Sequence, residues 1–311
     1  MNIIEFGDCR ETMRRWASDG IKAQTCVTSP PYYGLRDYGN DGQIGLEETP
    51  EEYIAAMVEV FRCVRDVLAD DGTVWLNIGD SYYNYRPGKG QSLVKQTVAN
   101  SDQDLPQTCA RRGNKLEGLK EKDLIGIPWM LAFALRADGW YLRQDIIWHK
   151  PNPMPESVQD RCTKAHEYIF LLSKSQKYYY DHEAIKEPLK GEPEVRDKNG
   201  EGYQADYAHG DRFSKGARVF GADGMANKRS VWSVPVKPYF GAHFAVFPQE
   251  LIEPCILAGA PVGGIVLDPF MGSGTTAQVA QNLGRQYIGC ELNTDYKTLQ
   301  DKRVAQQALV L

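Results

Sequence analysis

Residues 264–276 are Gly264-Ile-Val-Leu-Asp268-Pro-Phe-Met-Gly272-Ser-Gly274-Thr-Thr276, and this stretch decides the fold. An apolar strand ends in an aspartate, passes through a glycine turn and enters a helix. That order is typical of a βα unit in which glycines let the backbone approach a ligand at the carboxyl end of the strands. The turn lacks the G-K-[ST] of a phosphate-binding loop and the third glycine of a dinucleotide loop. It therefore predicts a cofactor site at the edge of a parallel sheet and disfavours phosphate binding.

The next predicted strand, residues 285–291, ends in a second acidic residue, Glu291. Because the carboxyl ends of adjacent parallel strands meet at one edge of a sheet, this carboxylate is expected beside the glycine turn. A carboxylate in that place can accept hydrogen bonds from both ribose hydroxyls of an adenosine cofactor. The C-terminal part of the chain is thus predicted to bind an adenosine.

Short apolar runs and helical periodicity alternate along the rest of the chain. Strands are predicted at residues 26–28, 73–78, 145–148, 168–172, 264–267 and 287–290. Helices are predicted at residues 51–68, 124–137, 248–258 and 275–283, where apolar residues recur every three or four positions. This order predicts an α/β fold with a mostly parallel sheet and helices on both faces.

The composition narrows the class of protein. The 311 residues are 42% hydrophobic and 25% charged, which excludes a disordered or fibrous chain. The formal net charge of −5 excludes a uniformly basic surface, so contacts with nucleic acid must come from local patches. Seven scattered cysteines without a C-x-x-C pair are typical of reduced thiols. Cys162 and His166 lack the second pair that a zinc site needs, so no metal is predicted.

Two long polar stretches interrupt the βα order. Residues 85–122 carry eight Lys or Arg against four Asp or Glu and are expected to form a mobile basic insert. Residues 183–230 become basic toward their end, at Arg212, Lys215, Arg218 and Arg229. In an acidic protein these are the expected contacts to a polyanion, and the alternative is a solvated loop. Residues 1–182 and 231–311 are expected to form one domain.

A second motif, Thr28-Ser29-Pro30-Pro31-Tyr32, directly follows the first predicted strand. Two consecutive prolines fix the backbone and remove two N–H donors, so carbonyl oxygens and the Ser29 hydroxyl remain as acceptors. A site made of acceptors favours a donor such as an NH2 group, and Tyr32 offers a face on which a planar base stacks. Together with a cofactor loop, the motif predicts a site for a base amine rather than a plain turn.

These residues resemble the amino-group DNA methyltransferases, which methylate N4 of cytosine or N6 of adenine with S-adenosylmethionine. Ser29-Pro30-Pro31-Tyr32 is similar to their catalytic tetrapeptide, and residues 268–274 are similar to the loop that binds their cofactor. Further matches are residues 146–153, 166–167, 231–233 and 243–248, so the resemblance covers nearly the whole chain outside the two polar inserts. A tetrapeptide far N-terminal to the cofactor loop resembles the β arrangement of motifs in that family.

The resemblance implies a Rossmann-like, S-adenosylmethionine-dependent methyltransferase fold with a polar recognition insert at residues 183–230. The catalytic residues it implies are Ser29, Pro30, Pro31 and Tyr32. The cofactor-binding residues it implies are Asp8, Phe247, Asp268, Pro269, Phe270, Gly272, Gly274, Thr275, Thr276 and Glu291, with Asp8 reaching the adenine and Glu291 the ribose. The DNA contacts it implies are the four basic residues of the recognition insert.

The resemblance leaves the target amine open. Serine at the first tetrapeptide position is similar to the N4-cytosine branch, whereas Asp or Asn is more usual for N6-adenine; cytosine N4 is favoured and adenine N6 is the alternative. A C5-cytosine enzyme with Cys255 as nucleophile is disfavoured because Cys255 lies in a helical pattern. Motif order disfavours glutamine and ribosomal RNA N-methyltransferases. The missing third glycine disfavours a nucleotide oxidoreductase, and the two intact motifs disfavour a DNA-binding module with a decayed site.

Double-stranded DNA is the expected partner, and the resemblance leaves open a homodimer and a cognate restriction enzyme. No basic start followed by an apolar run is present, and no apolar stretch approaches the roughly 20 residues of a membrane span. Membrane association is not expected. A cytoplasmic protein of bacterial, archaeal or phage-encoded type is expected.

Overall fold

The computed structural model describes residues 1–35, 39–40, 42–83, 116–191, 194–196, 202–203, 218–220, 223–237 and 247–305. Most of the predicted insert at residues 85–122 lies outside the described residues, as do Arg212, Lys215 and the side chain of Arg218. The chain forms two compact units: Met1–Tyr180 together with Ser230–Leu311, and Asp181–Arg229.

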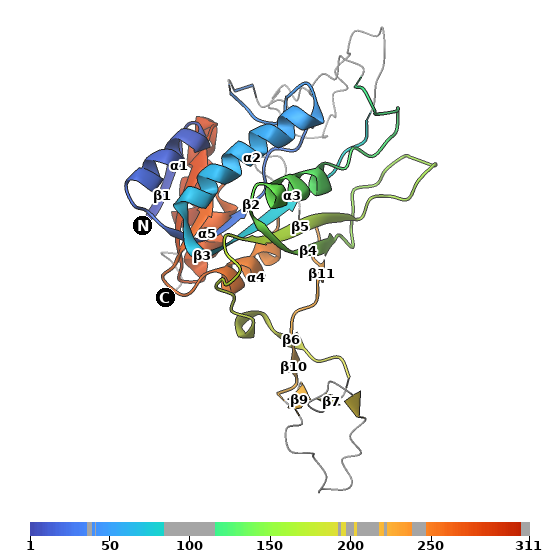
Figure 1. The fold of residues 1–311 in the computed structure, drawn as a ribbon, viewed down its shortest axis with the longest axis vertical. Coiled ribbons are helices and arrows are strands. Elements are labelled where there is room, and N and C mark those ends of the chain that lie inside the picture. Colours follow the sequence, from blue (N-terminus) through green and yellow to red (C-terminus); the bar gives the residue numbers. More distant parts are fainter. Residues whose placement is uncertain are drawn as a thin grey trace, which may run out of the picture. The chain divides into compact units, whose positions relative to one another are not determined.

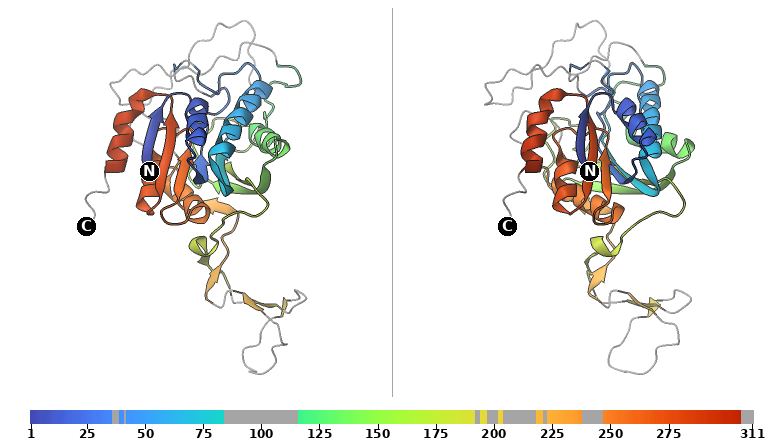
Figure 2. Two further views of the ribbon diagram at one scale, coloured as in Figure 1. Left: turned by 60° about the vertical axis from the view of Figure 1, so that its left-hand side comes forward. Right: turned by 90° about the vertical axis from the view of Figure 1, so that its left-hand side faces the viewer.

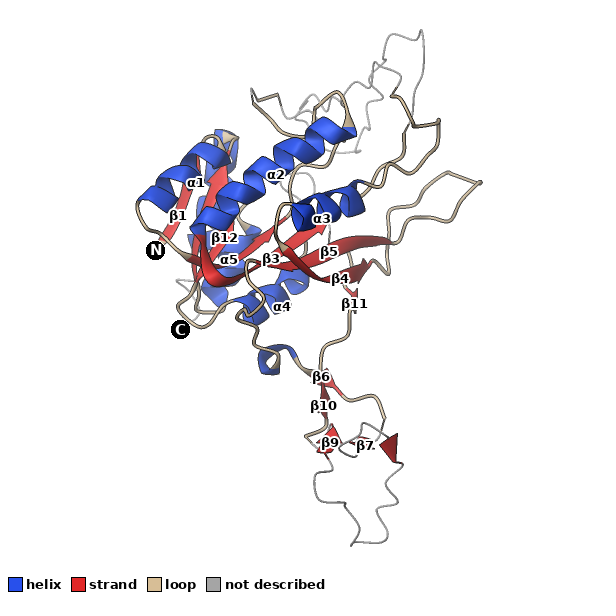
Figure 3. Cartoon of the chain, in the orientation of Figure 1, coloured by secondary structure: helices blue, strands red, loops and turns tan. Residues whose placement is uncertain are grey.

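An eight-stranded sheet forms the centre of the first unit (Figures 1 and 3), with the strand order β1-β13-β12-β2-β3-β5-β4-β11. Its strands are β1 (Asn2–Phe6), β2 (Ala23–Thr28), β3 (Leu68–Ile78), β4 (Tyr141–His149), β5 (His166–Ser173), β11 (Val231–Ser233), β12 (Ile265–Asp268) and β13 (Gln286–Glu291). Neighbouring strands are parallel, except that β5 runs opposite to both β3 and β4. The carboxyl ends of the other strands therefore meet at one edge, which the start of β5 shares.

Helices cover both faces of this sheet (Figure 2). One layer holds α1 (Cys9–Ser18), α2 (Pro50–Val67) and α3 (Ile127–Ala137), and the other holds α4 (Gln249–Gly259), α5 (Thr275–Asn282) and α6 (Lys297–Ala305). Helix α2 begins with a capping box formed by Thr49 and Glu52, and it buries an apolar face that includes Tyr53 and Phe61. Burial of one such large side chain contributes about 1.5–3 kcal/mol. The predicted α/β fold with a mostly parallel sheet is confirmed.

Strands β2 and β12 lie side by side in the middle of the sheet, and the chain leaves them in opposite directions. Strand β2 continues through α2 to β3, whereas β12 continues through α5 to β13 on the other side. Such a reversal is the point at which open α/β sheets bind ligands, outside the carboxyl ends of the strands. The two motifs found in the sequence directly follow these two strands.

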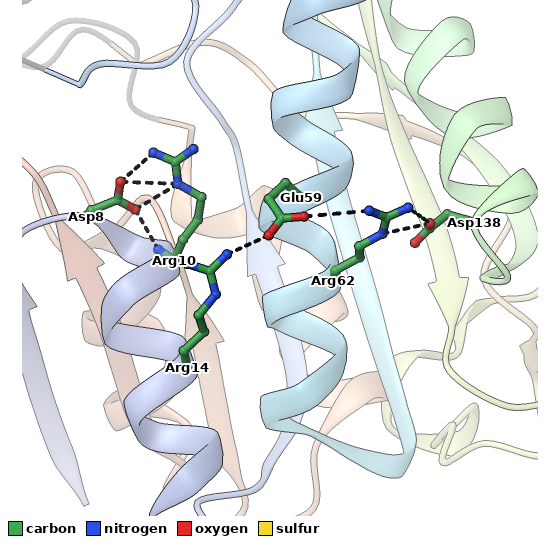
Figure 4. A network of polar contacts seen from close by, with 6 residues as sticks. All are labelled: Asp8, Arg10, Arg14, Glu59, Arg62 and Asp138. Atoms are coloured by element: carbon green, nitrogen blue, oxygen red, sulfur yellow. Dashed lines mark hydrogen bonds and ion pairs between the residues drawn. The ribbon is translucent and has the colours of Figure 1, made fainter.

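Ion pairs on the exposed helix surfaces connect α1, α2 and the end of α3 (Figure 4). Arg14 pairs with Glu59 at 2.5 Å, and Arg62 pairs with Asp138 at 2.6 Å. The Arg14–Glu59 pair is exposed on both sides and is therefore screened by water and salt, so it contributes little beside the buried apolar faces of the helices. Within the described part of the chain, no helix combines the length and the apolar character that crossing a bilayer requires.

The predicted strands are present, but β3 and β4 begin earlier than predicted. In β3 the exposed Asp70 and Asp71 interrupt the apolar run, and in β4 the first residues are mostly exposed, so the apolar pattern marks only the later part of each strand. Strand β1 was not predicted. Its five residues, Asn-Ile-Ile-Glu-Phe, form no continuous apolar run, and in the structure they are exposed or half-buried.

The second unit consists of short strands. Strands β6 (Glu187–Pro188) and β10 (Met225–Ala226) form one pair, and a three-stranded sheet has the order β8 (Gly202–Tyr203), β7 (Glu194–Arg196), β9 (Arg218–Phe220). Lys186 pairs with Glu183 at 2.9 Å and with Asp223 at 3.0 Å, and Arg229 pairs with Glu187. Of the predicted DNA contacts, Arg229 is thus held by an ion pair inside this unit.

Candidate active site

A cavity of about 160 Å³ opens at the carboxyl ends of β1, β13, β12 and β2. The predicted site residues that line it are Asp8, Ser29, Pro30, Pro31, Tyr32, Phe247, Asp268, Pro269, Phe270, Gly272, Thr275 and Glu291. Gly274 and Thr276 are not in its wall. Two strand ends from the first 30 residues and two from residues 265–291 thus supply one site.

The cofactor loop, residues 268–276, turns sharply at two glycines in the left-handed region. Gly272 has a φ of 55° and Gly274 a φ of 88°, and a Cβ atom at Gly274 would lie 3.4 Å from Gln300 of α6. Gln300 Nε2 donates to the Gly272 carbonyl at 2.7 Å, and Arg303 donates to the Thr275 hydroxyl. Both α6 side chains are buried. Helix α6 therefore braces the loop from behind.

Asp268 lies inside the wall of the cavity, with 1% of the residue exposed. Its Oδ1 accepts from the Thr28 hydroxyl at 2.6 Å and from the Phe270 amide at 3.0 Å, and its Oδ2 accepts from the Thr276 hydroxyl at 2.7 Å. Because burial outweighs these neutral donors, the pKa of Asp268 is raised to about 6. The carboxylate connects the end of β2 to the first turn of α5, and its oxygens are already engaged within the protein.

Glu291 is the second buried carboxylate of the site. Its Oε2 accepts from the Gly272 amide at 2.7 Å, and its Oε1 accepts from the Asn293 amide at 2.8 Å. Burial raises its pKa to about 6. Each carboxylate oxygen accepts about two hydrogen bonds, so both oxygens retain capacity for a donor in the cavity.

Asp8 caps the N-terminus of α1 and pairs with Arg10 (Figure 4). The Arg10 backbone amide donates to Asp8 Oδ1 at 2.8 Å and the Arg10 Nε donates to the same oxygen at 3.0 Å. Hydrogen bonding from Arg10 lowers the pKa of Asp8. Both residues line the cavity, so this wall presents an ion pair rather than a lone carboxylate.

One buried side-chain atom of the wall has no hydrogen-bond partner among the described residues. The Ser273 hydroxyl is buried and lines the cavity without a hydrogen bond. Buried hydroxyls are nearly always hydrogen-bonded, so this group is available to a ligand. Phe247, Phe270 and Ile44 provide apolar surface in the same cavity. The wall therefore suits a ligand with ribose hydroxyls, other polar groups and a flat apolar ring.

The tetrapeptide, residues 29–32, is held by side chains from distant elements. Tyr53 of α2 donates to the Pro31 carbonyl at 2.8 Å, and Tyr32 donates to Glu167 of β5 at 2.9 Å. Sequence reasoning missed five residues that support the site: Tyr53, Glu167, Asn293, Gln300 and Arg303. The one available signal was the match at residues 166–167, which carried no function.

The residues of this cavity do not favour a cysteine nucleophile or a metal site. Cys255 lies in α4, is buried, and donates to the Leu251 carbonyl at a Sγ–O distance of 3.7 Å. It is not in the cavity wall. Across the described residues, His, Cys, Asp and Glu side chains form no group of three or more that could hold a metal ion.

Comparisons with known proteins agree with this geometry. The model of the DNA methylase family (N6_N4_Mtase) matches residues 23–302. The chain is 48% identical over 301 residues to the Type II methyltransferase M.SmaI of Serratia marcescens, covering 97% of this chain and 90% of that one.

Two solved structures share the fold. The PvuII DNA methyltransferase (cytosine-N4-specific) has a TM-score of 0.62 at 17% identity, covering 97% of this chain and 86% of that one. A putative DNA modification methylase of Thermus thermophilus, solved with S-adenosyl-L-methionine, has a TM-score of 0.59 at 22% identity, covering 100% of this chain and 96% of that one. The family match, the close relative and the fold lead to one conclusion: the chain belongs to the DNA methylase family of N6 and N4 amino-methyltransferases.

Proposed function

We propose that this protein is a site-specific DNA methyltransferase that uses S-adenosylmethionine to methylate the exocyclic amine of a flipped base, with cytosine N4 as the target. One observation carries the proposal: the tetrapeptide and the cofactor loop line one cavity and are joined by the Thr28–Asp268 hydrogen bond. Ser29 at the first tetrapeptide position supports cytosine N4, as does the N4 specificity named for the PvuII enzyme. Adenine N6 is the alternative target.

The residues of the cavity fit this cofactor. Glu291 would accept hydrogen bonds from the ribose hydroxyls, and the Ser273 hydroxyl would bond to a polar group of the cofactor. Phe247 and Phe270 would contact its apolar parts. When bound, S-adenosylmethionine supplies an electrophilic methyl group on a sulfonium sulfur.

The tetrapeptide would make the lone pair of a weakly nucleophilic amine more available. The exocyclic amine of a base is conjugated with the ring, so its lone pair is poorly available. The Ser29 hydroxyl and the Pro30 carbonyl would accept the two amine hydrogens, which favours a tetrahedral nitrogen with its lone pair free. Holding the reactants in line supplies much of the acceleration in such a transfer.

The base must leave the duplex to reach the tetrapeptide. Extrusion costs a few kcal/mol of unstacking, and the ring of Tyr32 offers a stacking surface that offsets it by about 1–3 kcal/mol. Tyr32 thus acts before the methyl-transfer step.

Recognition of double-stranded DNA is assigned to residues 183–230, with Arg212, Lys215, Arg218 and Arg229 as contacts. Replacing the first three together should weaken DNA binding and flatten its salt dependence, since each phosphate contact contributes close to one unit of slope. An unchanged slope would assign the DNA contacts to another region. A restriction enzyme of the same sequence specificity, in the cytoplasm of a bacterium, is the expected functional partner.

The deciding experiment identifies the methylated nucleoside. The protein is incubated with duplex DNA and S-adenosylmethionine carrying a labelled methyl group, and the DNA is then digested to nucleosides. Label in N4-methylcytosine is expected, and label in N6-methyladenine would establish the alternative target. Label in neither would overturn the proposed function. Sequencing the modified DNA then gives the recognised site.

A further inference from the structure

A cluster of residues behind Tyr32 takes no part in the proposed methyl transfer. It comes from the ends of β3 and β4 and the start of β5, and consists of Asn77, Gly79, Lys150 and Glu167; these four residues are called the Tyr32 clamp. Because β5 is reversed, its first residues reach the same edge of the sheet as the tetrapeptide. Glu167 lies opposite Trp148 in the β4–β5 register, one position before Tyr168, which pairs with Ile78 of β3.

Glu167 is the centre of the clamp. Its Oε2 accepts from the Tyr32 hydroxyl at 2.9 Å and from Asn77 Nδ2 at 3.3 Å, and its Oε1 pairs with Lys150. The Glu167 and Lys150 side chains are only 16% and 18% exposed, so water screens this ion pair weakly. Lys150 also lies 4.2 Å from the centre of the Trp148 ring. Both oxygens of the carboxylate are therefore held in place.

Gly79 fixes the same ring from its edge. A Cβ atom at this position would lie 2.7 Å from Tyr32 Cε2, closer than real contacts allow. The ring therefore occupies space that only glycine leaves open. Hydrogen bonding at the hydroxyl and the absence of a side chain at Gly79 are independent constraints on one ring.

The hydroxyl stays a donor in this environment. Burial, and secondarily the Glu167 carboxylate, raise the pKa of Tyr32 well above its ordinary value. The phenol therefore remains protonated at neutral pH, and its hydrogen bond to Glu167 persists. A stacking surface whose orientation is set in advance loses less conformational entropy when a base arrives.

We infer that Glu167 is a positioning residue for Tyr32: held by Lys150 and Asn77, it sets the plane of the ring that receives the flipped base. This inference rests on the proposed function. It assigns Glu167 and Gly79 to base capture and leaves cofactor binding to the other residues of the cavity wall.

The test is a double-mutant cycle between Tyr32→Phe and Glu167→Gln. The readout is fluorescence of a base analogue at the methylated position of a duplex containing the mapped site, measured without cofactor, beside single-turnover methyl transfer with cofactor. Each single variant should lower the fluorescence signal and the single-turnover rate of methyl transfer by about tenfold, as expected for weakening one hydrogen bond to a charged group. The double variant should be no worse than the poorer single variant, because both act on the same contact: Tyr32→Phe removes the donor, and Glu167→Gln replaces the charged acceptor with a neutral amide. S-adenosylmethionine affinity should stay within about twofold of wild type, less than about 0.5 kcal/mol.

Controls separate positioning from general damage. Glu59→Gln breaks an exposed ion pair on α2 and should leave both readouts unchanged. Gly79→Ala keeps every polar partner of the clamp and should reproduce the fluorescence loss by displacing the ring. If Glu167→Gln lowers the midpoint temperature of thermal unfolding, the fluorescence of Tyr32→Phe and Gly79→Ala still tests whether the position of the Tyr32 ring controls base capture.

Multiplicative losses in the double variant, or unchanged fluorescence in Tyr32→Phe and Gly79→Ala, would overturn the inference. Failure of the proposed function looks different: wild-type protein would then transfer no methyl group to DNA.

Discussion

The cofactor loop and the tetrapeptide lie in the same cavity but are held in different ways. The cofactor loop is supported mainly by nearby segments, through the Gly272 and Asn293 amides on Glu291 and through α6. The tetrapeptide is held by Tyr53 of α2 and Glu167 of β5, which are distant in the sequence. Residues that support a motif can therefore be predicted from the sequence when they follow the motif closely. They cannot be predicted in this way when distant elements supply them.

The two regions also differ in charge. Asp268 and Glu291 have neutral donors as their hydrogen-bond partners, and burial raises the pKa of each to about 6. Glu167 behind the tetrapeptide is paired with Lys150. The cofactor side thus has two carboxylates that titrate about one unit below neutral pH, whereas the base side has an ion pair between Glu167 and Lys150. Binding on the cofactor side should respond to pH.

Ser29→Ala is expected to have the largest effect that is confined to one of the two regions. It removes one acceptor for the amine but leaves the Pro30 carbonyl and the cofactor loop intact. Loss of one well-placed hydrogen bond in a transition state costs on the order of 2–4 kcal/mol, so single-turnover methyl transfer should fall about 30- to 1,000-fold. Cofactor affinity measured by calorimetry should not change. Ser18→Ala on the surface of α1 is the matched control, and an undiminished rate in Ser29→Ala would refute the acceptor mechanism.

The next largest effect is the pH dependence that Asp268 gives to the free energy of unfolding. Its pKa is about 6 in the folded protein against 3.8 as the ordinary value, so the folded state binds more protons between these pH values. Its contribution to the free energy of unfolding therefore falls as pH rises from about 4 to about 6, by about 3 kcal/mol in total. Asp268→Asn should remove this decline. Urea unfolding of both proteins across that range measures it, and parallel pH curves would contradict the assignment.

Glu291→Ala tests the cofactor side directly. Losing the proposed acceptor of the ribose hydroxyls should weaken S-adenosylmethionine binding by about tenfold, or 1.4 kcal/mol. In wild type the affinity should fall as pH drops through about 6, because a protonated Glu291 loses acceptor capacity, and this dependence should shrink in the variant. Calorimetry at several pH values is the measurement. An affinity within twofold of wild type would exclude the ribose role.

The smallest effect is expected for Tyr53→Phe, which removes the donor to the Pro31 carbonyl. The free energy of unfolding should fall by about 1 kcal/mol, the typical value of one hydrogen bond, and methyl transfer should slow a few-fold. Tyr33→Phe is the matched control, since the Tyr33 hydroxyl donates to the Glu48 carbonyl at 3.2 Å instead. Equal rate losses in the two variants would show that the effect is not specific to the tetrapeptide.

The features that could be predicted from the sequence are those that short, local stretches of residues determine. The apolar strand before Asp268 and the strand before Glu291 belong to one βα unit, so their ends were expected to be neighbours, and β12 and β13 are indeed paired. The reversal of β5 could not be predicted, because the apolar run at residues 168–172 has no direction; the place of Glu167 remained hidden with it. The buried Gln300 and Arg303 lie in a mostly polar helix that was not predicted. The sequence also indicated a carboxylate at Asp268, but not that its oxygens are engaged inside the protein.

The pairing of β2 with β12 has a consequence for the synthesis of the chain. The Thr28–Asp268 hydrogen bond joins residues that are 240 positions apart. At a translation rate of about 5–20 residues per second, β2 waits roughly 10–50 s for its neighbour. Strand β1 waits longer still, because its neighbour in the sheet is β13. A growing chain therefore lacks the complete cavity wall until β12 and β13 have been synthesised, and it gains the capacity to modify DNA only after that point.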